Sequence, residues 1–324
     1  MRSLRFLLVG PGALGVSLSA AWTRSGNRCV GVYGRHPARA ARARKLLGVP
    51  APGRGPGKVL NDFDFALFAV PDGAIGEVAR RWASRAIWRG KVAFHCSGAL
   101  PASLLHPIRR RGAAVASLHP LTSVPAPTTQ ANLFAGTAFG IEGEPRACSL
   151  AARLVRRIGG EPFRVPVDAK PLYHAAACLA SGHLLALVAL ASDTIEREGI
   201  LPSRRARAAL LALSAATLDN ARRLGLERAL TGPVARGDVI TLRRHLTALT
   251  RQFPALGGLY KTLGTRALEL ALRGGRIGRR AAGDLREILA AKGERQVSPA
   301  LPEPGHSPSG GGAGKRTRPG KKTG

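Results

Sequence analysis

Three glycines near the N-terminus have the spacing of a phosphate-binding turn. The six residues that match the pattern G-x-G-x-x-G are Gly10, Pro11, Gly12, Ala13, Leu14 and Gly15. An apolar run suited to a buried strand precedes them and an apolar stretch suited to a helix follows, so the order favours a dinucleotide-binding turn. In such a turn the first glycine permits the sharp bend, the second lets the backbone approach a pyrophosphate, and the third lets helix and strand pack closely. The alternative is a glycine turn that serves only the fold.

The residue after the second predicted strand indicates which dinucleotide binds. An NAD site usually has Asp or Glu about 20 residues past the glycines, where it holds the ribose 2′-hydroxyl. Here Arg35 stands 20 residues after Gly15, and the first carboxylate of the chain is Asp62. An arginine suits the 2′-phosphate of NADP, so we predict NADP rather than NAD, with Arg35 in the cofactor site. The alternative is that Arg35 is one more arginine of an arginine-rich chain.

Further polar residues follow predicted strands of the first half. Ser97 ends the run 91–97 and Gly98 directly follows it, and His119 ends the run 113–119. Ligands of open α/β sheets bind at the carboxyl ends of strands, so these residues are candidate site residues. Val70 and Pro71 end another predicted strand and should reach the cofactor. The alternatives are a serine that caps a helix and a histidine that closes a turn.

Lys170 and His174 could carry the proton transfer of such a site. They lie four residues apart at the start of a predicted helix (residues 170–198) and should share one face of it. A lysine with a lowered pKa can give or take the proton of a substrate hydroxyl, and a histidine can bind the same oxygen. The alternative for Lys170 is a solvated lysine at a helix start.

The distribution of apolar runs predicts an α/β protein with two parts. Strand-like runs alternate with helical segments up to about residue 167, which predicts a Rossmann domain with a mostly parallel sheet over residues 1–167. Only helical patterns follow over residues 168–295. Residues 296–324 are rich in Pro, Gly, Ser and basic residues and are predicted to form a disordered basic tail.

Composition narrows the function class. The chain has 324 residues and a net charge of +31, but 41 of its 50 basic residues are arginine and the charge is spread along the chain. Nucleic acid is therefore not the expected partner, and a small anionic molecule is favoured. The four cysteines stand far apart without a CxxC or CxxH pair, so we expect no metal site and reduced thiols. No uninterrupted apolar stretch suggests a membrane span, and we expect a cytoplasmic protein.

The chain resembles, to about residue 292, a family of bacterial Rossmann-like proteins whose second half is a domain of unknown function. The matching stretches are GPGALG (10–15), FHCSGAL (94–100), SLHPLTS (117–123), FGIEG (139–143), LYHAAACLASGHL (172–184) and ALTGPVARGD (229–238). It is more distantly similar to the superfamily of β-hydroxyacid dehydrogenases, ketopantoate reductases and pyrroline-5-carboxylate reductases. That resemblance implies an all-α second domain like the C-terminal domain of 6-phosphogluconate dehydrogenase, and a homodimer.

The resemblance also implies roles for individual residues. Ser97 and Gly98 match a Ser-Gly that holds the substrate carboxylate in β-hydroxyacid dehydrogenases. Lys170 matches their acid/base lysine, whereas His174 stands where they have asparagine. His119 is similar to the histidine of prephenate dehydrogenases that binds the reacting hydroxyl. In a loop like that of the reductases, Arg236 is a candidate clamp for a carboxylate.

Together these observations predict an NADP-dependent oxidoreductase for a small carboxylate-bearing hydroxy, keto or imino compound. One alternative is a regulatory protein that binds NADP(H) without catalysis. Another is a polyanion or nucleic-acid binder that uses the basic charge and the tail.

Overall fold

The computed structural model describes residues 2–50 and 60–291 of the chain. Contacts divide the chain into two compact units, residues 1–187 and 188–324, and each is described by itself. The predicted basic tail, residues 296–324, lies outside the described residues.

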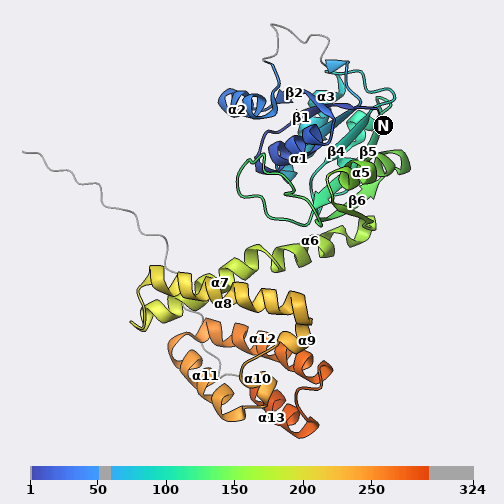
Figure 1. Ribbon diagram of the computed structural model, residues 1–324. Coiled ribbons are helices and arrows are strands. Elements are labelled where there is room, and N and C mark those ends of the chain that lie inside the picture. Colours follow the sequence, from blue (N-terminus) through green and yellow to red (C-terminus); the bar gives the residue numbers. More distant parts are fainter. Residues whose placement is uncertain (1, 51–59, 292–324) are drawn as a thin grey trace, which may run out of the picture. The chain divides into compact units, whose positions relative to one another are not determined.

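A seven-stranded sheet forms the centre of the first unit (Figure 1). Its strands are β1 (Arg5–Val9), β2 (Arg28–Tyr33), β3 (Phe65–Phe68), β4 (Val92–His95), β5 (Ala114–Pro120), β6 (Ala138–Gly143) and β7 (Glu161–Arg164). The order in the sheet is β2-β1-β3-β4-β5-β6-β7, and all neighbours are parallel except β5 and β6. The chain therefore reverses its winding direction between β1 and β3, which is where ligands bind in doubly wound sheets.

Apolar residues on both faces of the strands explain the layers. Along β1, Phe6 and Leu8 pack in one core and Leu7 and Val9 in another, because successive side chains point to opposite faces. The helices of this unit are α1 (Ala13–Arg24), α2 (Pro37–Leu47), α3 (Ile75–Ala83), α4 (His106–Arg109), α5 (Pro145–Arg157) and α6 (Lys170–Leu179). Helices α1 and α5 bury residues in the first core, and α3 and α4 in the second. The predicted α/β fold with a mostly parallel sheet is confirmed.

The second unit is helical. Its elements are α8 (Ser203–Leu224), α9 (Leu226–Ala229), α10 (Pro233–Arg236), α11 (Val239–Gln252), α12 (Pro254–Arg273) and α13 (Arg279–Ala290), and α7 (Gly182–Arg197) crosses the division between the units. Leu242, Leu268 and Leu285 lie at the centre of its core. The predicted all-α second half is confirmed. The predicted domain boundary after residue 167 stays a prediction, because the change from strands to helices and the division by contacts fall at different places.

The single helix predicted over residues 170–198 is two helices, α6 and α7. The chain turns at Ala180 and Ser181, where the Ser181 hydroxyl donates to the Ala177 carbonyl at 2.8 Å. Serine and glycine favour helices weakly, and Ser181 is followed by Gly182, which accounts for the break.

One stretch, Val167–Arg197, is long and apolar enough to cross a membrane by length and composition alone. An 18-residue segment of it has a mean hydropathy of 1.8, and 6% of that segment is buried. This differs from the expectation above, because no charged residue stands between Lys170 and Asp193. A single such stretch is weak evidence for a membrane span, since the first residue of α6 is buried against the sheet.

Candidate functional site

The glycine turn after β1 has the backbone that the motif predicts. Gly10 has φ +94° and donates a hydrogen bond to the Tyr33 carbonyl at 2.8 Å. A Cβ atom there would lie 2.4 Å from the Ala69 carbonyl oxygen. At Gly15 a Cβ would lie 2.7 Å from both Ala69 Cβ and the Gly10 oxygen. The fold therefore requires glycine at both positions, one for the left-handed bend and one for close packing of α1 on the sheet.

Gly12 is different, because nothing in the described chain requires a glycine there. Its φ is −80°, which any residue adopts, and a Cβ atom would meet no atom within 4 Å. It is exposed and caps α1 without a side-chain hydrogen bond, so the first N–H groups of a 12-residue helix face open space beside it. This opening in the backbone is a cradle that a side chain would fill, and its N–H groups and positive helix end suit a phosphate.

Arg35 follows β2 and lies beside this turn. A Cβ atom on Gly34 would lie 2.6 Å from Cδ of Pro11, so the chain at the end of β2 passes against the glycine turn. Arg35 is exposed, and Arg39 is exposed one turn into α2. On the other side of the turn, the Val70 side chain would contact a Cβ on Gly10 at 2.7 Å, and Pro71 is exposed. The predicted cofactor residues therefore gather around the carboxyl ends of β1, β2 and β3.

Gly98 brings two of the predicted site histidines together. A Cβ atom at Gly98 would lie 2.4 Å from Cδ2 of His174 and 2.9 Å from Nε2 of His119. The two imidazole rings have centroids 5.4 Å apart, and both side chains are half-buried. Residues from β5, from α6 and from the loop after β4 thus form one cluster, which we call the histidine cluster (Gly98, His119, His174).

His119 is held by Tyr173. Its Nδ1 lies 2.9 Å from the Tyr173 hydroxyl, and the two rings meet edge to face. Burial, and then the neighbouring His174 and Lys170, lower the pKa of His119 to about 4. The ring is therefore neutral at physiological pH.

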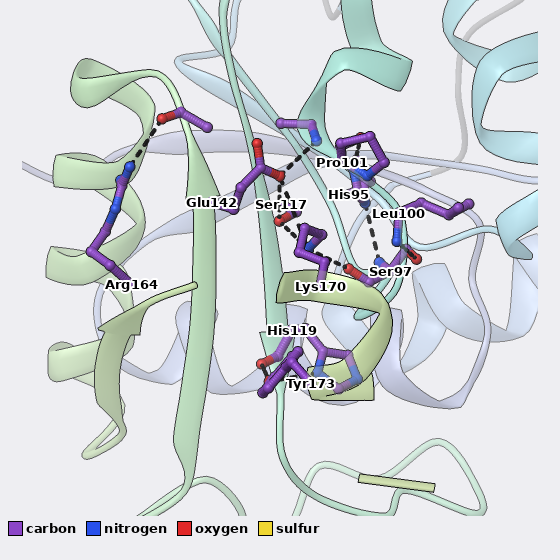
Figure 2. Close-up of polar contacts among 12 residues, drawn as sticks. His95, Ser97, Leu100, Pro101, Ser117, His119, Glu142, Arg164, Lys170 and Tyr173 are labelled. Atoms are coloured by element: carbon purple, nitrogen blue, oxygen red, sulfur yellow. Dashed lines mark hydrogen bonds and ion pairs between the residues drawn. The ribbon is translucent and has the colours of Figure 1, made fainter. Parts of the chain in front are cut away.

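Lys170 is buried, and its amine contacts Ser117 and the Ser97 carbonyl rather than His119 (Figure 2). Its side chain is 1% exposed, and its Nζ donates to Ser117 Oγ at 2.8 Å and to the Ser97 carbonyl at 3.4 Å. A carboxylate oxygen of Glu142 lies 4.0 Å from the amine. Burial lowers the pKa of Lys170, while Glu142 opposes that shift. Although Lys170 and His174 were expected to share one helix face, the Lys170 amine bonds Ser117 while the His174 ring lies against Gly98. The acid/base role of Lys170 stays a prediction.

Ser97 already makes two side-chain hydrogen bonds. Its Oγ donates to Asp72 at 2.7 Å and accepts from the Leu100 N–H at 3.0 Å. Its own N–H donates to Nδ1 of His95 at 3.1 Å, and Nε2 of His95 donates to the Pro101 carbonyl at 3.0 Å. The predicted contact of Ser97 with a substrate carboxylate stays a prediction, and the hydroxyl hydrogen is engaged by Asp72.

Two family descriptions match the chain. The Rossmann-like domain matches residues 2–120, and a domain of unknown function, DUF2520, matches residues 137–267. The chain joins a Rossmann-like domain to a DUF2520 domain. The expected family resemblance is confirmed. The histidine cluster contains residues from both matched regions. Gly98 and His119 lie in the Rossmann-like match, and His174 lies in the DUF2520 match.

Solved structures share the fold of this Rossmann-like and DUF2520 chain. Protein TM1727 from Thermotoga maritima is 24% identical, with a TM-score of 0.64 over 83% of this chain and 98% of its own. A Bacteroides fragilis protein named as an NADP oxidoreductase is 20% identical, with a TM-score of 0.65 over 82% and 98%. A 1-pyrroline-5-carboxylate reductase from Streptococcus pyogenes is 11% identical, with a TM-score of 0.56 over 85% and 99%. A comparison with curated proteins found no match.

Three residues of the site were not expected from the sequence: His95, Glu142 and Tyr173. Asp72 was expected at the cofactor edge but not as a partner of Ser97. Asp72 directly follows the predicted strand that ends at Pro71, so its position at the sheet edge was a usable signal. His95 and Glu142 lie within strands, and no sequence pattern separates them from other strand residues. Arg236 lies in α10, which belongs to the second structural unit and falls within the DUF2520 match. Its predicted role as a carboxylate clamp stays a prediction.

Proposed function

We propose that this protein is an NADP-dependent oxidoreductase that acts on a small carboxylate-bearing hydroxy, keto or imino compound. The observation that carries the proposal is Gly12. The fold requires glycine at positions 10 and 15 of the motif but not at position 12, where the missing side chain leaves open space at the N-terminus of α1. A glycine with no role in packing or backbone strain is explained by a ligand that approaches the backbone there.

The residues around this turn fit a dinucleotide. Residues 10–15 would hold the pyrophosphate, with Val70 and Pro71 beside it at the end of β3. Arg35 would pair with a 2′-phosphate, and the end of β2 has no carboxylate to hold a 2′-hydroxyl. The name of the Bacteroides fragilis relative is consistent with this choice. When bound, the cofactor supplies the capacity to give or accept a hydride.

The histidine cluster provides the polar groups beside that cofactor site. His119 and His174 would contact the reacting group of the substrate, because both flank Gly98 at the edge of the sheet. Lys170 would act from behind them by holding the Ser97 carbonyl and balancing the charge of Glu142. Ser97 and Gly98 would shape the substrate side, and Arg236 is proposed to pair with the substrate carboxylate.

Titration of the purified protein with NADPH and with NADH tests the cofactor. Fluorescence of the reduced nicotinamide reports binding for the wild type, for Arg35→Ala and for Arg85→Ala as an exposed control far along the sequence. NADPH should bind at least about tenfold more tightly than NADH, which corresponds to about 1.4 kcal/mol, and Arg35→Ala alone should remove the difference. Equal affinities in the wild type would contradict the NADP assignment.

We also propose a cytoplasmic homodimer. Leu172, Leu179 and Leu185 on α6 and α7 are each more than 60% exposed, and we take them as the candidate interface. A second copy of the chain would cover this apolar surface. The protein should appear in the soluble fraction without detergent and give a dimer mass by light scattering. A monomer, or a protein found only in membranes, would contradict this proposal.

A regulatory protein that binds NADP(H) without catalysis is the second candidate. The burial of Lys170 and the engagement of Ser97 by Asp72 favour it, because two residues expected at the substrate are already occupied by the protein. A regulatory protein would bind NADPH as tightly as the proposed enzyme does. It would not oxidise NADPH with any keto or imino acid.

A further inference from the structure

The hydrogen bonds of His119 define which ring nitrogen carries its proton. Nδ1 lies 2.9 Å from the Tyr173 hydroxyl, and the same hydroxyl lies 3.4 Å from the His119 carbonyl oxygen (Figure 2). A phenol has one hydrogen to donate. A separation of 3.4 Å is long for a hydrogen bond between two oxygens, whereas 2.9 Å is ordinary. The shorter contact favours donation of the Tyr173 hydrogen to Nδ1 over donation to the carbonyl.

Because Nδ1 accepts that hydrogen, it carries none of its own. The His119 ring is neutral at physiological pH, since burial and the neighbours His174 and Lys170 lower its pKa to about 4. A neutral imidazole with a bare Nδ1 must carry its hydrogen on Nε2. His119 is then a hydrogen-bond donor at Nε2 and not a base.

Nε2 is the nitrogen beside Gly98. It would lie 2.9 Å from a Cβ at that position, and Cδ2 of His174 would lie 2.4 Å from the same Cβ, so both rings pack directly against this glycine. A ligand atom that contacts Nε2 of His119 would therefore meet its N–H.

Contacts with the sheet hold the Tyr173 hydroxyl in place beside Nδ1 of His119. A Cβ atom at Gly140 on β6 would lie 2.6 Å from its hydroxyl oxygen, and the Phe163 ring on β7 packs edge to face with its centroid 5.9 Å away. The glycine at position 140 thus leaves room for the phenol against the sheet. Burial raises the pKa of Tyr173 to about 12, so the hydroxyl keeps its hydrogen.

We propose that Tyr173 is a positioning residue that fixes His119 as the Nε2–H tautomer, and that the site therefore selects a carbonyl oxygen over a protonated imine. A carbonyl oxygen accepts the Nε2–H hydrogen bond, whereas a protonated imine has only a hydrogen to donate and would face another donor. The selection of a keto substrate rests on the proposed function; the tautomer does not.

Nitrogen NMR of the full chain labelled with ¹⁵N-histidine tests the tautomer at neutral pH without cofactor. His119→Gln assigns the His119 signals. In the wild type, Nδ1 should resonate in the region of a bare nitrogen and Nε2 in that of a protonated one. In Tyr173→Phe both signals should move toward a common average. A protonated Nδ1 in the wild type, or an unchanged pattern in Tyr173→Phe, would overturn the proposal.

The chain offers a matched control. In the second unit, the Tyr260 hydroxyl lies 2.8 Å from Nδ1 of His245, with the same edge-to-face geometry. Tyr260→Phe should change the His245 signals and leave those of His119 as they are. Thermal unfolding of both variants verifies that each is folded.

The substrate class is tested on the same Nε2 signal with NADP⁺ bound. The probes are three α-keto acids (pyruvate, α-ketobutyrate and α-ketoglutarate) and pyrroline-5-carboxylate as the imine. A keto acid should shift the Nε2 resonance of His119 in the wild type, and this shift should be absent in Tyr173→Phe. A response to the imine alone, or to no probe, would overturn the carbonyl assignment. If NADP⁺ itself fails to bind, the cofactor titration shows that the proposed function has failed while the tautomer result stands.

Discussion

The hydroxyl of Ser97, after β4, donates a 2.7 Å hydrogen bond to the carboxylate of Asp72, after β3. The bond joins the ends of two neighbouring parallel strands and leaves the serine oxygen accepting only from the backbone of Leu100. Ser97 is 4% exposed, so this pair holds the loop that carries Gly98.

Removal of the Ser97 hydroxyl should therefore destabilise the fold. In Ser97→Ala the half-buried Leu100 N–H loses its acceptor, which should cost about 1 kcal/mol in the free energy of unfolding. Asp72→Asn keeps an acceptor for the hydroxyl and should cost less. Urea denaturation measures both, with Ser103→Ala on the exposed side of the next turn as control. Equal stability of Ser97→Ala and the control would show that the bond does not matter.

Lys170→Met should leave the mostly buried carboxylate of Glu142 without its cation. Breaking a buried pair in this way costs about 3–5 kcal/mol, and a value near the lower end is expected because Glu142 keeps hydrogen bonds from Ala102 and Ser117. The double variant Lys170→Met with Glu142→Gln should recover part of this loss. A double-mutant cycle of the free energies of unfolding measures the coupling between the two residues. If Lys170→Met unfolds like the wild type, the lysine is not part of the buried network.

Stability should decrease as the pH is lowered, because of His95. The side chain is 0% exposed, and burial lowers its pKa to about 4. The unfolded histidine titrates near pH 6.5, so between about pH 6.5 and 4 the unfolded chain binds a proton that the folded chain does not. The contribution is complete above pH 6.5 and is lost as the pH falls toward 4, by up to about 3 kcal/mol. His119 acts in the same direction.

Denaturant unfolding over this pH range tests the assignment. His95→Gln should have lower stability at neutral pH and a smaller loss between about pH 6.5 and 4 than the wild type. An unchanged pH dependence in the variant would assign the effect to other groups.

Gly15→Ala should destabilise the first unit. Its Cβ would lie 2.7 Å from Ala69 Cβ and from the Gly10 oxygen, and overpacking of this kind costs about 1–3 kcal/mol. Gly76→Ala in α3 is the matched control, since a Cβ there meets only the end of the Arg80 side chain at 3.8 Å. That change should be neutral or stabilise by up to about 1 kcal/mol. Thermal unfolding distinguishes the two, and the same effect for both would contradict the packing role of Gly15.

The sheet edge was predictable from the sequence. Strand ends are marked by a change from apolar to polar residues, and parallel strands bring their carboxyl ends to one edge. Gly10, Ser97 and His119 could therefore be placed together before the structure was known. β7 was not predicted, because Glu161–Arg164 is a largely exposed edge strand without apolar alternation.

The depth of each side chain was not predictable. The spacing of Lys170 and His174 fixes their common helix face, but Lys170 stands at the first residue of α6, where the chain turns into the sheet. Its amine therefore reaches Ser117, while His174 stays at the edge. The pairing of Tyr173 with His119 depends on the space left by Gly140, which becomes visible only when β6 and α6 lie side by side.

NADPH binding by Gly12→Val tests the central claim most directly. The variant should fold with a free energy of unfolding within about 1 kcal/mol of the wild type, because its Cβ meets no atom within 4 Å and valine is only a poorer helix cap. Gly76→Ala serves as the control. The account predicts that the wild type and the control bind NADPH and that Gly12→Val binds at least about tenfold more weakly, a loss of about 1.4 kcal/mol. Equal affinity in all three proteins, or no binding by the wild type, would contradict it.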